Sequence, residues 1–142
     1  MTATALRTGA LLVFDGDCGF CTTSVRWFER RFPDAFATAP YQFTDLDSLG
    51  LTERECTEKV QWIADVAAPR TTRSEGARAI SAMVRHGGRS IGGAMGSAWR
   101  AAGTVADVVP VSLLADVVYA AIAANRQRLP GGTPACAMPR AS

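Results

Sequence analysis

Residues 11–21 have the sequence LLVFDGDCGFC, an apolar run that leads through Asp-Gly-Asp to two cysteines, Cys18 and Cys21. A short continuous apolar run bounded by turn residues is typical of a buried strand, and we expect one over 10–14. The apolar residues that follow recur at intervals of three or four, which predicts a helix over 19–32 with one buried face: Cys21, Val25, Phe28 and Phe32. The two thiols therefore lie where a strand passes into a helix.

A pair of thiols in this position has a chemical use. The first turn of a helix presents unsatisfied N–H groups and a partial positive charge, which favour a thiolate at Cys18. Sites of thiol–disulfide exchange are built in this way. We expect Cys18 to be the attacking thiol, because it lies nearer the helix N-terminus and solvent, and Cys21 to resolve the mixed disulfide. Half of a zinc site, or two buried structural thiols, are the alternatives.

Two carboxyl groups precede the thiols and complete the set of candidate catalytic residues: Cys18, Cys21, Asp15 and Asp17. Asp17 is expected to oppose ionisation of the neighbouring thiol, which is typical of a reductant rather than a strong oxidant. A buried Asp15 would have a raised pKa and could pass a proton to or from Cys21. Alternatively, both aspartates only cap the helix or close an Asx-turn.

The composition is that of one soluble domain. The chain has 142 residues, of which 48% are hydrophobic and 20% charged. A net charge of +2 and scattered arginines argue against a nucleic-acid partner. The N-terminus has no apolar segment of the length found in secretory signals, so we expect a cytoplasmic protein. In a reducing cytoplasm, Cys-x-x-Cys is more often catalytic or metal-binding than structural.

Further strands and helices alternate along the chain. A strand is predicted over 37–43, at a sheet edge because Pro40 has no N–H for the ladder. After a helical turn over 44–50, a capping box at Thr52 and Glu55 opens a short helix. The other expected elements are a hairpin of strands over 60–66 and 71–73, and helices over 74–86, 91–102 and 111–128.

This order of elements predicts an α/β fold with a small mixed sheet flanked by helices. A Cys-x-x-Cys after the first strand of such a pattern indicates a thioredoxin-like arrangement. We expect a single domain over 1–142. It comprises a core over about 10–86, a C-terminal helical extension over about 91–128 and a loose tail over 129–142.

The C-terminal half contains the longest apolar stretch, 105–124. Asp107, Pro110 and Asp116 interrupt it, which argues against a membrane span. A buried or partner-facing helix is the better interpretation, with an apolar face formed by Leu114, Val117, Val118, Ala121 and Ile122. Ahead of this stretch, Ser74 is expected to cap the helix over 74–86, and Gly87-Gly88 to stop it.

The remaining thiols and the single histidine admit several roles. Cys136 is either a third redox thiol that reaches back to the dithiol or a free tail cysteine. Cys56 is expected to pack in the interior, and His86 to lie on the surface at a helix C-terminus. A zinc site built on Cys18 and Cys21 would need these residues as further ligands. Structural zinc sites commonly use two close pairs of ligands, and the sequence has only one.

The string DGDCGFC over 15–21 resembles the D-x-D-C-x-x-C signature of the DCC family of thiol-disulfide oxidoreductase-like proteins. The C-terminal segment 125–136 is also similar to that family, and the likeness covers about residues 10–139. The resemblance implies a thioredoxin-like core, disulfide oxidoreductase activity at Cys18 and Cys21, and a functional role for Asp15 and Asp17. It names no substrate.

One departure from thioredoxins proper concerns how substrate docks. Thioredoxins place a cis-proline beside the dithiol, just before a core strand. Here residues 56–59, before Val60, are Cys-Thr-Glu-Lys and include no proline. Substrate docking of the thioredoxin type is therefore in doubt.

The leading hypothesis is an enzyme that uses Cys18 and Cys21 to reduce or exchange disulfides without a cofactor. Its substrates would be disulfide-containing proteins or low-molecular-weight thiols, and an unidentified redox partner would restore the dithiol. The alternative is a metal-binding or non-catalytic thioredoxin-like interaction module.

Overall fold

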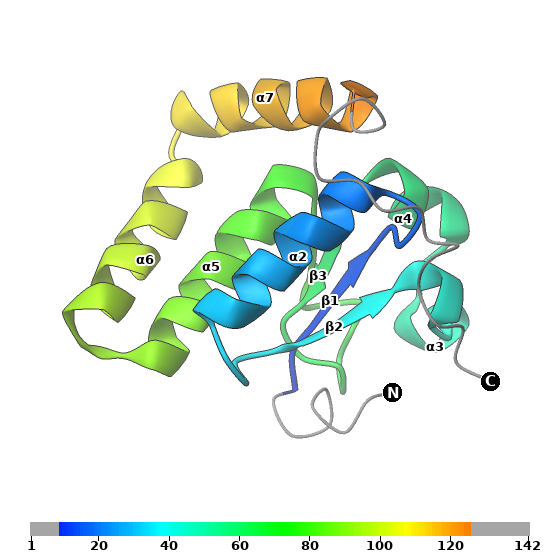
Figure 1. Cartoon of the computed structure of the whole chain (residues 1–142), viewed down its shortest axis with the longest axis horizontal. Coiled ribbons are helices and arrows are strands. Elements are labelled where there is room, and N and C mark those ends of the chain that lie inside the picture. Colours follow the sequence, from blue (N-terminus) through cyan, green and yellow to red (C-terminus); the bar gives the residue numbers. More distant parts are fainter. Residues whose placement is uncertain (1–8, 126–142) are drawn as a thin grey trace.

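The structure is a computed structural model, and it describes residues 9–125 (Figure 1). Four strands form one mixed sheet in the order β2-β1-β3-β4. The central strand β1 (Leu11–Phe14) pairs parallel with β2 (Ala37–Pro40) and antiparallel with β3 (Gln61–Ile63), which pairs antiparallel with β4 (Arg73–Glu75). The mixed sheet with flanking helices confirms the predicted α/β fold class.

Helices cover both faces of the sheet because side chains alternate along β1. Leu12 and Phe14 face a core shared with α2 (Gly19–Arg31) and α5 (Gly76–Ile91). Leu11 and Val13 face a second core formed with the two short helices α3 (Leu46–Leu49) and α4 (Glu53–Glu58). The apolar face predicted for α2 packs in the first core: Cys21, Val25, Phe28 and Phe32. The capping box of Thr52 and Glu55 opens α4 as predicted.

Strands β2 and β3 are shorter than the sequence predicts, for local reasons, and β4 is shifted along the chain. β2 lies at the sheet edge as predicted but ends at Pro40, and the chain continues as a 3₁₀ helix, η1 (Tyr41–Phe43). β3 ends at Ile63 because Asp65 closes a turn, with its carboxylate accepting the Ala67 N–H at 2.9 Å. The last strand spans Arg73–Glu75 rather than 71–73.

The prediction that Gly87-Gly88 stops a helix is wrong, because α5 continues to Ile91. Instead, these glycines allow Phe32 and α6 to pack closely against α5. A Cβ atom on Gly87 would lie 2.5 Å from the ring of Phe32, and one on Gly88 would lie 2.7 Å from the carbonyl oxygen of Gly96. The close approach allows α6 (Gly93–Ala106) to pack along α5. Helix α5 ends instead at Gly92, which has a φ of 62°.

The last described helix, α7 (Val111–Asn125), crosses above the start of α5 and the start of α2 (Figure 1). The apolar face predicted for it is largely exposed, with Val117 at 66%. Of that face only Ile122 lines a cavity between α2 and α7, together with Tyr119 and Ala123, which were not predicted. Within residues 9–125, no single helix has the length and apolar character needed to cross a membrane; α6 and α7 would meet both criteria only as a pair bent by 88°.

Candidate active site

A disulfide joins Cys18 and Cys21 across the first turn of α2, with their Cα atoms 5.2 Å apart. Cys18 is the N-cap residue of the helix, and its sulfur accepts the backbone N–H of Cys21 at 3.2 Å. An N-cap side chain normally satisfies one of the free N–H groups of the first helical turn, and here a sulfur atom has that function. The strand-to-helix position predicted for the two thiols is therefore confirmed.

The relative exposure of the two sulfurs differs from the prediction. Cys18 is only 1% exposed, whereas Cys21 is partly exposed. The expectation that Cys18 lies nearer solvent is thus wrong. The cause is the turn that follows β1, where the Cys18 N–H donates to the Asp15 carbonyl oxygen at 3.3 Å and folds Cys18 inward. Cys21 lies one turn further along α2, on the wall of a cavity.

The turn between β1 and α2 is organised by its two carboxylates. Asp15 is buried, and its Oδ1 atom accepts the Asp17 N–H at 3.0 Å, which is the Asx-turn considered above. Asp15 also lines the cavity that contains Cys21, whereas Asp17 is exposed. The structure therefore brings Asp15 to the dithiol and leaves Asp17 on the rim of the site.

Gln42 is a site residue that sequence reasoning missed. Its Nε2 donates to Asp15 Oδ1 at 2.9 Å and to Asp17 Oδ2 at 3.1 Å, while its Oε1 accepts the Gly16 N–H at 3.0 Å. One amide thus holds all three residues of the Asp-Gly-Asp turn. Gln42 lies just after β2, and the ends of parallel neighbours β1 and β2 meet at the same sheet edge. Nothing in the sequence indicated this role, because the strand predicted over 37–43 includes Gln42, whereas β2 ends at Pro40.

We expect Gln42→Glu to shift the thiol–disulfide equilibrium of the dithiol toward the disulfide. The substitution places a third negative charge beside the turn, and this charge disfavours a thiolate in the reduced protein. The equilibrium constant with glutathione should change by about ten-fold, since a charge near a partly buried site contributes about 1–2 kcal/mol. Gln42→Met, which keeps the size and adds no charge, is the control. Equal shifts in both variants would show that the charge is not the cause.

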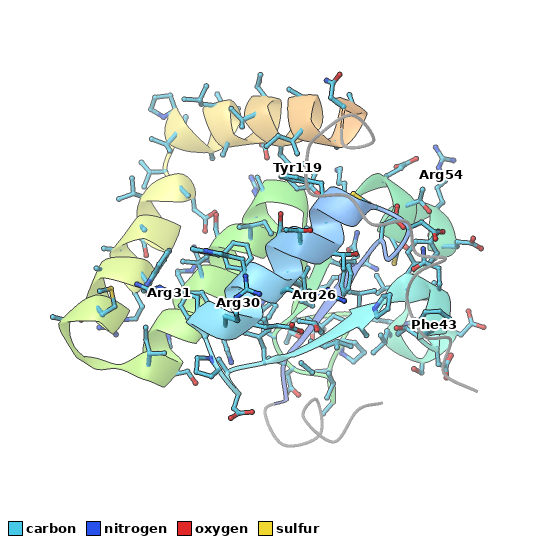
Figure 2. The ribbon with its side chains drawn as sticks, in the orientation of Figure 1. Arg26, Arg30, Arg31, Phe43, Arg54 and Tyr119 are labelled. Carbon is cyan, nitrogen blue, oxygen red and sulfur yellow. A yellow bond between two sulfur atoms is a disulfide. The ribbon has the colours of Figure 1, made fainter. Side chains whose placement is uncertain are left out.

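The cavity beside Cys21 has a volume of about 100 Å³. Its walls come from β1, α2, α4, α5 and α7, and they are mostly apolar. Tyr119 projects from α7 toward the body of the protein (Figure 2), and its hydroxyl accepts the Val60 N–H at 2.9 Å. Val60 directly precedes β3 and follows residues 56–59, the segment that lacks the proline of thioredoxins. In this chain, the backbone N–H of Val60 is hydrogen-bonded to a side chain of α7.

Cys56 and His86 take no part in the hydrogen bonds of the Asp-Gly-Asp turn, and Cys56 forms part of the cavity wall. Cys56 packs in the interior as predicted, and burial raises the pKa of its thiol to about 11. His86 was expected on the surface at a helix end, but α5 continues past it. The ring is half-buried against Trp62, with Nε2 lying 3.1 Å from the Ala35 carbonyl oxygen, and burial lowers its pKa. Cys136 lies outside the described residues.

The described part of the chain contains no group of three or more His, Cys, Asp or Glu side chains placed to hold a metal ion. The zinc ligands considered from the sequence, Cys56 and His86, therefore form no such group with the dithiol, although Cys56 lines the same cavity as Cys21. Instead, the cysteine pair directly follows the turn that Asp15 and Gln42 hold. This arrangement is suited to thiol–disulfide exchange.

Comparison with known families agrees with this geometry. The family model described as DCC1-like thiol-disulfide oxidoreductase matches residues 12–132. No match was found among curated proteins or among solved structures. The matched span contains the dithiol, the Asp-Gly-Asp turn, Gln42 and the helix that closes the cavity. The chain therefore belongs to the DCC1-like thiol-disulfide oxidoreductase family.

Proposed function

We propose that this protein catalyses thiol–disulfide exchange through Cys18 and Cys21, on disulfides of proteins or small molecules. The observation that carries the proposal is the position of the pair, bonded to each other at the N-terminus of α2 with the Cys18 sulfur accepting a backbone N–H. Helix N-termini favour the thiolate, which is the reactive form in exchange. The family to which the chain belongs supports the same chemistry.

In the overall reaction, the protein disulfide and two substrate thiols give the protein dithiol and a substrate disulfide, and the reverse reaction reduces a substrate. Asp15 lies in the wall of the cavity that contains Cys21, and we assign it the transfer of protons to and from the dithiol. We place this reaction in a reducing cytoplasm, with a separate redox partner that restores the starting state. Asp17 and Gln42 position the turn that carries the first thiol.

The test is a redox titration of the purified protein in glutathione buffers, followed by thiol alkylation and mass spectrometry. We expect Cys18 and Cys21 to convert together in one two-electron transition, and the midpoint to separate a reductant from an oxidant. Cys136→Ser protein, titrated in parallel, shows whether the tail thiol contributes. Independent titration of the two thiols, or their failure to form a bridge, would contradict the proposal.

A further inference from the structure

We propose that the outer face of α7 binds an anionic lipid bilayer, so that the protein docks on a membrane surface without crossing it. This inference goes beyond the proposed function, which concerns the dithiol on the inner side of α7. The outer face consists of six exposed aliphatic side chains: Leu113, Leu114, Val117, Val118, Ala121 and Ala124.

The outer face is apolar along the whole helix. Its residues recur at intervals of three or four, so they share one side of α7. Leu114 is 64% exposed and Val117 is 66% exposed. The linker that precedes α7 adds two more exposed aliphatic side chains, Val108 and Val109. Monomeric proteins rarely expose contiguous apolar patches of this kind, and such patches mark sites that bind a protein or a membrane.

The single charged residue of α7 lies beside this face and not within it. Asp116 lines a hollow on the flank of the helix, together with Lys59 and Arg78. The outer face therefore offers hydrocarbon without a charge that contact with lipid would strip of its hydration.

The composition of the outer face favours lipid over a protein partner. Protein–protein interfaces derive most of their binding energy from Trp, Tyr and Arg, whereas Leu and Val are under-represented among such residues. The six residues of the outer face are Leu, Val and Ala only. Within the described part of the chain, α6 and α7 together also reach the hydropathy and low charge of a membrane segment.

The arrangement of the two helices decides how α7 can meet a bilayer. The axes of α6 and α7 are bent by 88° from each other, so α7 lies flat across one end of the molecule (Figure 1). The Tyr119 hydroxyl holds the inner side of α7 to the Val60 N–H. Interfacial helices lie in the membrane plane with an apolar face at the boundary of headgroups and acyl chains. The geometry of α7 fits this mode of binding.

The charge of the chain complements an anionic surface on the same side. Residues 76–142 contain seven Arg and two Asp, whereas residues 1–75 contain eight Lys or Arg and eleven Asp or Glu. One of the two, Asp107, is paired with Arg85. Arg126 and Arg128 follow α7 directly in the sequence. Basic residues beside an apolar segment attract anionic headgroups, which the cytoplasmic leaflet of membranes carries.

Binding through the outer face would bring the dithiol close to the membrane. Tyr119, Ile122 and Ala123 of α7 line the cavity that contains Cys21. The dithiol would then lie about one helix diameter, ~10 Å, from the lipid surface. The disulfides nearest to it would be those of molecules at the membrane surface, a consequence that rests on the proposed function.

Vesicle flotation of the full chain tests the proposal. The protein is mixed with vesicles of phosphatidylcholine alone, or of equal parts phosphatidylcholine and phosphatidylglycerol. We expect the partition coefficient to be at least ten-fold higher on the mixed vesicles. Leu114→Glu should lower it at least ten-fold. Met95→Glu, the same change of charge at a 55% exposed position in the first turn of α6, should leave it within two-fold. Equal losses in the two variants would overturn the assignment to α7.

A second pair of variants tests the role of charge. Arg126→Gln combined with Arg128→Gln should weaken binding to the mixed vesicles at least ten-fold, because each basic residue near the surface contributes to the attraction. Arg54→Gln combined with Arg70→Gln removes two exposed arginines from the N-terminal half and should have no such effect. Equal binding of the wild-type protein to both kinds of vesicle would overturn the anionic preference.

A second copy of the chain on the outer face would give a different result. The protein would then sediment as a dimer without vesicles, Leu114→Glu would make it a monomer, and flotation would fail; this outcome overturns the proposal. Similar melting temperatures show that the variants fold. Because flotation uses no thiol reagent, its result is independent of the glutathione titration that tests the proposed function.

Discussion

Cys21→Ser is expected to abolish disulfide reduction, with a loss on the order of 10³-fold or more, as found when one member of a catalytic unit is removed. A serine hydroxyl stays protonated at neutral pH and forms no disulfide, so neither the mixed disulfide nor the internal bridge can form. The measurement is the steady-state reduction of an aromatic disulfide, with a dithiol as the electron donor. Cys18→Ser should lose turnover to the same extent, because the internal thiol is then missing.

Thermal unfolding in reducing buffer is the control for this experiment. The bridge is open in wild type and variant under those conditions, so a similar melting temperature shows that the substitution acts on chemistry and not on folding. If Cys21→Ser kept more than about a tenth of the wild-type rate, a loss of only about 1.4 kcal/mol in transition-state stabilisation, the exchange would have to run through another thiol, such as Cys136.

Gly96→Val should have the largest effect on stability, lowering the free energy of unfolding by about 3 kcal/mol, at the upper end of the usual range for overpacking. Gly96 is buried where α6 crosses α5, and a Cβ atom there would overlap the carbonyl oxygen of Gly88. The obstacle is backbone, which cannot rotate aside as a side chain can. The helices would have to separate, and the packing of Trp99 against Phe32 would be lost with them.

The matched control is Ala98→Val, an exposed position on the same helix. It should cost only the intrinsic helix penalty of a β-branched residue, about 0.5 kcal/mol. Denaturant unfolding followed by tryptophan fluorescence measures both variants. Equal losses would show that the close approach of α5 and α6 is not required for stability.

The segment from β1 through α2 could be predicted from the sequence because its signals are local. The apolar run of Leu11–Phe14, the turn residues after it and the spacing of Val25 and Phe32 each act within a few residues. The same holds for the capping box at Thr52 and for Pro40, which forced β2 to a sheet edge. Backbone hydrogen bonds and side-chain periodicity depend on near neighbours, so the sequence alone indicated these elements and the dithiol between them.

Apart from the strand lengths, the errors concerned positions whose role depends on distant segments. Gly87 and Gly88 have the local character of a helix stop, yet Phe32 and Gly96 pack against them and α5 continues. His86 was consequently placed at a helix end rather than half-buried beside Trp62.

The site itself shows the same division. The sequence determined that two thiols lie at a helix N-terminus after a buried strand, because the strand, the turn and the start of the helix are formed by consecutive residues. Only the tertiary structure decided that Gln42 holds the Asp-Gly-Asp turn, that Cys18 is enclosed and Cys21 faces a cavity, and that α7 closes that cavity through Tyr119. The physical reason is that each of these contacts joins elements far apart in the chain, and their docking depends on the packing of the whole protein.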